Sequence, residues 1–325
     1  MNNIIKKSFF CFLVFFGLQS LLHGLPAAEQ EKTTLTIYGI KGPSGIGMIR
    51  LFEEVPQVQG FDVRVEALAQ ADLVAARFIA GEAKIGILPP NVAAKIASSG
   101  KNIKVAAVIG MGMLSLLSAD PQVQSINDLR GKTVEVAGQG ATPDYVFRRI
   151  LLEKGLKPDT DVKLGYSLAY PEMAQSLLAG RISIALLPEP FATIALSGKP
   201  DLKLIGDIQN EWRGFAGGEN FPMTVLAVDG DFASKNPEAL SIILKSLSDS
   251  IQWTKDHPVE AGALAAKHDL GFPQGAAAQA IPKSNYVFIP AVQARSALEN
   301  LFKVFLDFSP VSIGGALPQD SFYLR

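Results

Sequence analysis

Two glycine-rich segments have the composition of loops that bind small molecules. Residues 42–45 read GPSG, and residues 138–143 read GQGATP. Glycine lets a backbone approach a ligand closely, and the free N–H groups at a helix start hold an oxyanion or another polar edge. Ser44 and Thr142 are placed to cap the helices that follow. Either loop alone could be a well-capped helix start and nothing more, but two such loops at matching positions favour a binding site.

A third loop contributes an acidic side chain. Glu189 lies between Pro188 and Pro190. At a cleft it would accept hydrogen bonds from an amino or heterocyclic N–H group, which a plain sulfonate does not offer. The alternative is a rigid turn or a carboxylate that stabilises a helix start through the helix dipole. Aromatic residues such as Phe191 and Phe221 could form an apolar wall for a ligand, or they could be ordinary core.

The candidate loops follow predicted strands, where open α/β sheets bind their ligands. The loops span residues 41–47, 88–91, 138–143 and 187–190. Neither GxxxxGK[ST] nor GxGxxG occurs in the glycine-rich loops, so nucleotide binding is not indicated. The predicted ligand-binding residues are Gly42, Pro43, Ser44, Gly45, Pro90, Asn91, Gly138, Gln139, Gly140, Ala141, Thr142, Glu189 and Phe221.

Enzymatic chemistry finds little support in the residue types. Cys11 is the only cysteine and falls in an N-terminal apolar run, so cysteine catalysis and cysteine-based zinc sites are not expected. His257 and His268 lie in the C-terminal third, away from the candidate loops, and their spacing of 11 residues does not suit two metal ligands on one helix. We therefore predict no catalytic residue, no metal and no cofactor.

An internal repeat indicates how these loops are positioned. Residues 75–98 align without gaps to residues 174–197, with eight identical positions. Each copy reads as a helix end, a glycine, a short apolar strand, and a proline-marked turn that opens another helix. Upstream of each copy, a strand leads into one of the glycine-rich loops. Because two repeats are too few for a solenoid, we predict two lobes of the same βαβ type.

Alternating strands and helices predict an α/β protein with largely parallel sheets. Strands are expected near residues 35–38, 61–66, 85–88 and 104–109 in the first lobe, and near 133–136, 162–166, 182–187 and 202–205 in the second. The chain crosses between lobes near Gly110–Gly112 and returns near Phe221–Thr224. After the return we expect helices without strong strands, packed back on the first lobe. The predicted lobes are residues 28–110 with 225–325, and residues 111–224, with a ligand cleft and a hinge of two crossings.

The first 27 residues have the features of a secretory signal. Lys6 and Lys7 precede an apolar run from Phe9 to Leu22, and Leu25–Ala28 provides small residues for cleavage. An uncleaved anchor is the alternative. Removal leaves 28 Lys and Arg against 31 Asp and Glu, a net charge of −3. Without a basic surplus, nucleic acid is not an expected partner. Because no lipobox precedes Cys11, we expect a freely soluble periplasmic or extracytoplasmic protein.

The order of these motifs resembles a family of transport proteins. The segments INDLRGKTVEVAGQGATPDYVFRRILLEKGL and LLAGRISIALLPEPFATIAL, with a helical C-terminal third, resemble solute-binding proteins of ABC importers. Within these, the chain looks like the nitrate/sulfonate/taurine group, also called NMT1/THI5-like. The resemblance covers about residues 33–325. It implies a type II periplasmic-binding-protein fold, capture of a small solute between two lobes, delivery to an ABC permease and its ATPase, and no catalysis.

The ligand class stays open at this level. A sulfonate or another oxyanion is favoured by the paired helix-start loops. A pyrimidine-like or thiamine-precursor-like heterocycle is the alternative, because of Glu189 and the aromatic residues. A ligand-sensing receptor domain has the same fold and is a further alternative. We expect a monomer.

Overall fold

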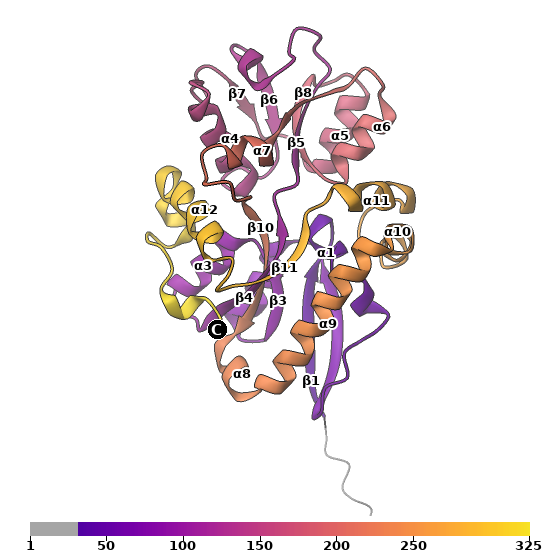
Figure 1. The fold of residues 1–325 in the computed structure, drawn as a ribbon, viewed down its shortest axis with the longest axis vertical. Helices are drawn as coiled ribbons and strands as arrows, with labels where there is room; N and C mark the ends of the chain where they lie inside the picture. Colours follow the sequence, from indigo (N-terminus) through magenta and orange to yellow (C-terminus); the bar gives the residue numbers. More distant parts are fainter. Residues whose placement is uncertain (1–31) are drawn as a thin grey trace, which may run out of the picture.

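The computed structural model describes residues 32–325, which form two α/β lobes joined near the middle of the molecule (Figure 1). The predicted signal segment, residues 1–27, and Cys11 lie outside the described residues. Among the described residues, no helix is long and apolar enough to cross a membrane. We call the lobe with the six-stranded sheet lobe 1 and the lobe with the five-stranded sheet lobe 2.

Lobe 1 is built on a sheet in the order β11-β4-β10-β3-β1-β2. Its strands are β1 (Thr33–Ile40), β2 (Phe61–Leu68), β3 (Ile85–Leu88), β4 (Ile103–Met111), β10 (Pro222–Asp229) and β11 (Tyr286–Pro290). β1 pairs in parallel with β2 and β3, whereas β10 is antiparallel to both of its neighbours, β3 and β4. β3 is buried along its whole length, as expected for a central strand covered on both faces.

Lobe 2 repeats this arrangement in the order β7-β6-β8-β5-β9. Its strands are β5 (Leu114–Ser118), β6 (Thr133–Val136), β7 (Lys163–Gly165), β8 (Ile184–Pro188) and β9 (Lys203–Asp207). β6 pairs in parallel with β7 and β8, and β5 runs antiparallel between β8 and β9. The positions of β2, β1, β3, β10 and β4 in lobe 1 thus correspond to those of β7, β6, β8, β5 and β9.

Helices surround both sheets (Figure 1). The described helices are α1 (Pro43–Ile46), α2 (Ala71–Ala80), α3 (Pro90–Ser98), α4 (Thr142–Glu153), α5 (Tyr170–Leu178), α6 (Phe191–Gly198), α7 (Ile208–Arg213), α8 (Gly230–Lys235), α9 (Pro237–Asp256), α10 (Pro258–Lys267), α11 (Gln274–Ala280) and α12 (Arg295–Phe308). Short 3₁₀ helices are η1 (Ile49–Phe52), η2 (Ile126–Leu129), η3 (Ile281–Lys283), η4 (Pro310–Ile313) and η5 (Asp320–Phe322).

The sequence repeat is confirmed as a structural repeat. Residues 75–98 run through α2, β3 and α3, and residues 174–197 run through α5, β8 and α6. The shared glycines, Gly81 and Gly180, have φ angles of 79° and 68°, in the left-handed region that ends helices and that glycine adopts without strain. The same residue types therefore end the same helices in both lobes.

Two expectations about the strands are wrong. The sheets are mixed, because β10 in lobe 1 and β5 in lobe 2, which enter just after the chain has crossed from the other lobe, run antiparallel to their neighbours, as does β11 at the edge of lobe 1. Hydrophobic alternation carries no information on strand direction. The region after the return also contains a strand, β11, which pairs antiparallel with β4 at the sheet edge through an irregular register. Its five residues, YVFIP, are too few to stand out among helices.

The lobes are connected where one apolar run is divided. The strand predicted near residues 104–109 is β4, and β5 follows it directly; the two belong to different sheets and are separated by Gly112 and Met113. The return passes through Phe221 into β10. The C-terminal helices pack mainly on lobe 1, but α12 also contacts α4 of lobe 2 and so lies at the lobe junction (Figure 1).

Candidate ligand-binding site

The GPSG loop is fixed by contacts that require glycine. Gly42 has a φ of 101°, and a Cβ on Gly45 would lie 2.4 Å from the carbonyl oxygen of Ile40. The loop then forms α1, a single turn that starts at Pro43. Its side-chain capping prediction is wrong, because Gly42 is the N-cap and Ser44 makes no cap bond. The Ser44 hydroxyl instead lies 3.2 Å from the hydroxyl of Thr224 on β10.

Asp144, in the first turn of α4, holds the second loop, Gly138–Thr142, by a hydrogen bond to its backbone. The carboxylate of Asp144 is buried and accepts hydrogen bonds from Gly140 N–H at 2.8 Å, Arg148 Nε at 2.7 Å and Tyr166 Oη at 2.7 Å. Burial lowers the pKa of Arg148, but hydrogen bonds and charges from Asp159 and Asp144 outweigh it and hold that pKa above its ordinary value. Asp144 is therefore a positioning residue for the loop.

Two side-chain oxygens at helix starts are buried and have no hydrogen-bond partner among the described residues. One is Oγ1 of Thr142, whose side chain does not cap α4 because Ala141 is the N-cap. The other is Oδ1 of Asn91, in the first turn of α3. Buried polar atoms are almost always paired, and one without a partner costs about 1–3 kcal/mol. An acceptor or donor in each lobe is therefore free for a ligand or a water.

Glu189 lies directly before Pro190, the N-cap of α6, and its carboxylate bonds the first turn of that helix, as the helix-start interpretation predicts. Its Oε2 accepts a hydrogen bond from the backbone N–H of Thr193 at 3.1 Å, and its own N–H donates to Met113 O at 3.0 Å. The residue is 5% exposed. Burial raises the pKa of the carboxyl, and hydrogen bonds from Thr193 and the charge of Lys283 only partly offset this.

Lobe 1 approaches Glu189 through the segment that leads into β11. The ammonium group of Lys283 donates to Thr193 Oγ1 at 3.2 Å, across the lobe boundary. Tyr286 Oη donates to Pro43 O in the GPSG loop at 2.9 Å. Burial raises the pKa of the Tyr286 hydroxyl, and the charge of Glu189 adds to this, so the two groups share one electrostatic environment. The structure therefore brings the GPSG loop, Tyr286 and Glu189 together at the lobe junction.

Phe221 lies at the hinge and is fully buried. Its ring packs edge-on against Trp212, with centroids 5.4 Å apart, and its carbonyl oxygen accepts a hydrogen bond from Gly112 N–H at 2.7 Å. A Cβ on Gly112 would lie 2.5 Å from Cζ of Phe221. Phe221 therefore acts as core between the two crossings, the alternative to an exposed ligand wall.

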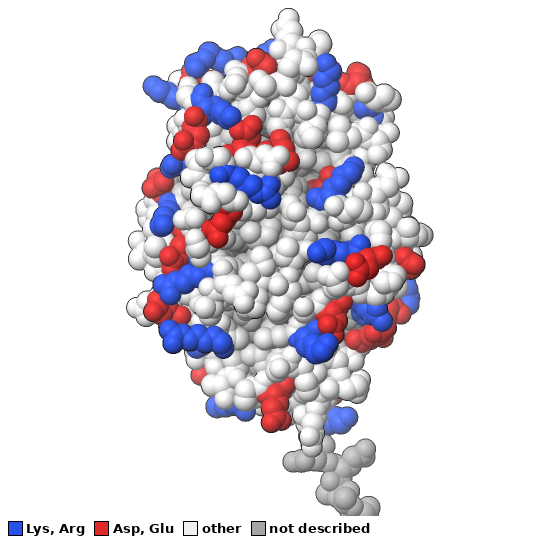
Figure 2. Space-filling view, viewed as in Figure 1, with Lys and Arg blue, Asp and Glu red and all other residues white. Residues whose placement is uncertain are grey.

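The lobes are in contact on both sides of the hinge. On the α11 side, the rings of Phe191 and Phe272 are 5.3 Å apart. On the α12 side, Tyr145 stacks on Phe308 at 5.5 Å. Hollows remain beside both contacts: about 520 Å³ between α5, α6 and α11, and about 410 Å³ beside Gln139, Gly140 and Phe308. Figure 2 shows that the middle of one face, where the lobes meet, carries few charged side chains.

Sequence reasoning missed the lobe 1 residues that contact the GPSG loop and lobe 2 at the junction. Thr224 was recognised as part of the return crossing but not as a partner of the GPSG loop. Lys283 and Tyr286 precede and begin a strand that was not predicted. The usable signal was the apolar run YVFIP directly after Lys283–Asn285. A polar segment followed by a short apolar run is typical of a loop that enters a strand.

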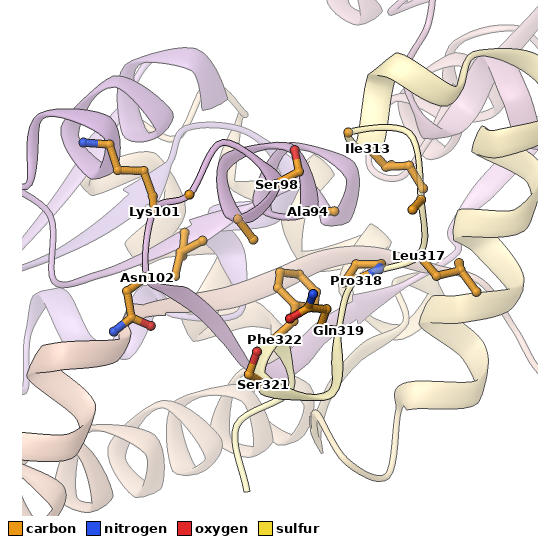
Figure 3. Close-up of a pocket in the computed structure, with 15 residues that line it drawn as sticks. Ala94, Ser98, Lys101, Asn102, Ile313, Leu317, Pro318, Gln319, Ser321 and Phe322 are labelled. Atoms are coloured by element: carbon orange, nitrogen blue, oxygen red, sulfur yellow. The ribbon is translucent and has the colours of Figure 1, made fainter.

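Other features lie apart from this junction. A hollow of about 350 Å³ in lobe 1 is formed by the end of α3 and the C-terminal segment from Ile313 to Phe322, with Ser98 on one side and Gln319 and Phe322 on the other (Figure 3). None of the predicted site residues lines it. His257 stacks on Trp253 and His268 pairs with Glu53, both in lobe 1. In residues 32–325, no cluster of His, Cys, Asp and Glu suits a metal ion.

Comparison with known proteins decides the family. The model of the NMT1-like family matches residues 55–268, well over half of the chain. The chain belongs to the NMT1-like family. The match extends from the segment before β2 to the end of α10, so it includes both crossings and the loops at β3, β6 and β8.

Relatives and solved structures agree with membership of the NMT1-like family. The nitrate/nitrite binding protein NrtA of Synechococcus elongatus is 24% identical over 52% of this chain. The matched part covers only 37% of that relative's length. An ABC transporter structure from Parabacteroides distasonis has 26% identity and a TM-score of 0.78 over 90% of this chain and 99% of that one. The periplasmic aliphatic sulphonate binding protein SsuA from Escherichia coli has 17% identity and a TM-score of 0.69 over 86% of this chain and 87% of that one.

These likenesses confirm the predicted fold class. The chain has the α/β periplasmic-binding-protein fold, with two sheets covered by helices, and the resemblance to the NMT1-like group stated from its motifs is confirmed.

Proposed function

We propose that this protein is the extracytoplasmic solute-binding component of an ABC importer. It captures a small solute between its lobes and delivers it to a membrane permease that works with an ATPase. Its membership of the NMT1-like family and its likeness to the structures described above support this proposal. The proposed lobes are residues 28–110 with 225–325, and residues 111–224, after a signal segment of residues 1–27.

The observation that carries the proposal is the meeting of polar groups from both lobes at the hinge. Lobe 1 contributes the GPSG loop, Thr224 and Tyr286. Lobe 2 contributes Glu189. In addition, one buried side-chain oxygen in each lobe has no hydrogen-bond partner among the described residues: Oδ1 of Asn91 in lobe 1 and Oγ1 of Thr142 in lobe 2. A site divided between two bodies is complete only when they close, so a ligand that contacts both halves stabilises the closed form.

An oxyanion such as a sulfonate or nitrate is the first proposed ligand class. The start of α4 carries free backbone N–H groups, the positive end of the helix dipole and the unpartnered Thr142 hydroxyl, all of which favour an anion. The names of the nitrate and sulphonate binding relatives agree with this class.

A heterocycle with an N–H donor is the alternative ligand class, and one observation favours it. Glu189 is a buried carboxylate beside the junction, and in its ionised form it attracts N–H donors and repels anions. A ligand-sensing domain that docks on a membrane receptor would use the same site. We propose no catalytic step, because the side chains of the two described histidines, His257 and His268, pair with Trp253 and Glu53 and not with a residue of the candidate site.

Thermal unfolding against a panel of solutes tests the proposal. The secreted protein is first unfolded and refolded to remove any bound solute, and then measured with sulfonates, nitrate, bicarbonate, amino acids, pyrimidines and divalent metals. A ligand at about 1,000 times its dissociation constant adds about 4 kcal/mol to the stability of the folded state. For a protein of this size, about 2–4 °C in Tm corresponds to each kcal/mol.

The pattern of shifts distinguishes the ligand classes. A rise in Tm of several degrees confined to sulfonates or nitrate supports the oxyanion proposal. A rise confined to pyrimidines supports the alternative. An unchanged Tm throughout the panel contradicts both ligand classes and favours docking on a protein partner.

A further inference from the structure

The segment Lys283–Tyr286 contacts three parts of the lobe junction: α6 of lobe 2, the hinge and the GPSG loop. Lys283 reaches Thr193 on α6 of lobe 2 at 3.2 Å. Asn285 contacts the hinge, because its side-chain amide donates to Gly112 O and its carbonyl oxygen accepts from Met111 N–H at 2.9 Å. Tyr286 donates to Pro43 O in the GPSG loop at 2.9 Å. Four consecutive residues thus connect the opposite lobe, the hinge and the binding loop.

The hinge contact is reinforced by a second amide. Asn220, just before the return crossing, donates from Nδ2 to the same carbonyl oxygen of Gly112 at 3.2 Å. Gly112 N–H in turn donates to Phe221 O at 2.7 Å. Both polar groups of the Gly112 backbone are therefore paired in this arrangement of the lobes. The Asn285 end of the segment is therefore bonded to the hinge, and its Lys283 end faces lobe 2.

The Lys283 contact joins the two lobes. Thr193 belongs to lobe 2, whereas Lys283 is the last residue of η3 and belongs to lobe 1, so a rotation of the lobes about Gly112 and Phe221 would separate the two side chains. Thr193 is 1% exposed, and its backbone N–H is the group that holds the Glu189 carboxylate. The ammonium group also lies close enough for its charge to favour the ionised form of Glu189. Lys283 therefore contacts the Glu189 loop from across the lobe boundary.

We infer that the segment Lys283–Tyr286 couples lobe closure to the ligand site, with Lys283 as the positioning residue that holds the Thr193–Glu189 turn against lobe 1. Closure places the ammonium group on Thr193. Through Asn285 and Tyr286 the same backbone fixes the hinge and the GPSG loop. The inference rests on the proposed function only in treating this junction as the ligand site.

A distance measurement between spin labels tests the role of Lys283 without any solute. Residues 28–325 contain no cysteine, so in the secreted protein Arg181→Cys, in the turn after α5, and Val259→Cys, at a position 61% exposed on α10, can be labelled specifically. Lys283→Met is expected to lower the closed-to-open ratio roughly tenfold, the change expected for one charge-assisted hydrogen bond. Lys255→Met, on the exposed surface of α9, is the matched control and should keep the wild-type distances.

Two further variants separate positioning from a merely structural role. Lys283→Arg keeps a cationic donor and should restore the wild-type distance distribution. Tyr286→Phe should leave that distribution unchanged but increase hydrogen exchange at residues 42–47, because Pro43 O loses its donor. If Lys283→Met and the wild type give identical distances, the inference is wrong. The result is independent of the solute panel, since a panel without Tm shifts contradicts the proposed function and leaves these distances unaffected.

Discussion

The side-chain hydroxyls of Ser44 and Thr224 lie 3.2 Å apart, and this contact joins the first candidate loop to the strand by which the chain returns from lobe 2. Ser44 follows β1, and Thr224 lies three residues after Phe221, the buried ring of the hinge. A ligand that draws the Ser44 hydroxyl away must therefore change a bond made by the return crossing. The loop and the hinge are one connected unit in lobe 1.

Replacing Thr224 by Val tests this connection. Valine has a similar shape, so packing is retained, but Ser44 loses its side-chain partner. Thr224 is 4% exposed, and loss of one neutral hydrogen bond there is expected to cost about 0.5–1.5 kcal/mol of unfolding free energy. The affinity for the solute that raises Tm in the panel should also fall, because Ser44 is no longer oriented.

The Thr224→Val experiment combines urea unfolding with a titration of that solute. Thr34→Val, at an exposed position of β1, is the control and should leave both quantities within error. An unchanged affinity in Thr224→Val, together with the expected loss of stability, would remove Ser44 from the ligand site.

The hinge should not tolerate a side chain at Gly112. In Gly112→Ala the new Cβ would lie 2.5 Å from Phe221 Cζ and 2.6 Å from Asn220 Oδ1, so the buried crossings must separate. Overpacking of this kind costs about 1–3 kcal/mol. Gly275→Ala on α11 is the matched control, because nothing lies within 4 Å of its Cβ position and alanine favours the helix by roughly 0.5–1 kcal/mol. Urea unfolding of both variants in the same buffer measures the difference in their unfolding free energies. Equal stabilities would contradict the predicted overpacking at Gly112.

The stability of the protein should depend on pH through Glu189. Burial raises the folded-state pKa of this carboxyl above its unfolded value, so ionisation is less favourable in the folded protein. The resulting contribution to stability is fully present below the unfolded pKa and is lost as the pH rises through the folded pKa. Glu189→Gln keeps an acceptor for Thr193 N–H but cannot ionise.

The wild type and Glu189→Gln should therefore differ most at neutral pH. We expect the unfolding free energy of the wild type, relative to the variant, to fall as the pH is raised from about 4 to 8. Urea unfolding at intervals across this range isolates the effect, because all other titrating groups are common to both proteins. A difference that stays constant with pH would show that burial of the ionised carboxylate carries no net cost.

Much of the fold followed from local patterns. The helix-ending glycines, Gly81 and Gly180, and the proline turns marked the same unit twice, and the predicted strands near residues 35–38, 85–88 and 133–136 all lie in observed strands. Strand direction was not predictable, because β10 and β5 take their places only after the chain crosses between lobes. β11 was missed since its pairing with β4 is a long-range contact with no local signal beyond five apolar residues.

The loops of the candidate site could be predicted from the sequence, but the side chains that reach them from the segment before β11 could not. The loops after β1, β6 and β8 were found because glycines and prolines at strand ends carry a recognisable signal. Lys283 and Tyr286 could not be placed beside Glu189 from sequence, because about 100 residues and a second lobe crossing separate them. The side-chain caps predicted for Ser44 and Thr142 were wrong, since Gly42 and Ala141 occupy the N-cap positions and each hydroxyl lies one or two residues too far along the helix.

Thr142 offers a test in which stability and binding should respond in opposite directions. Its Oγ1 is buried without a hydrogen-bond partner among the described residues, so Thr142→Val removes an unsatisfied polar atom at constant shape. Stability should be unchanged or higher by up to about 1 kcal/mol, because the hydroxyl contributes only a desolvation cost to the solute-free protein. If this hydroxyl contacts the solute, affinity should fall about 3–10-fold, the equivalent of one neutral hydrogen bond.

Thr254→Val is the matched control for Thr142→Val. Thr254 is fully buried in lobe 1 and its hydroxyl donates to Ile46 O at 3.5 Å, so this variant should lose stability and keep its affinity. Thermal unfolding with and without the solute measures both quantities, and a Thr142→Val protein that is destabilised but binds normally would show that the hydroxyl serves the fold of α4 and not the ligand.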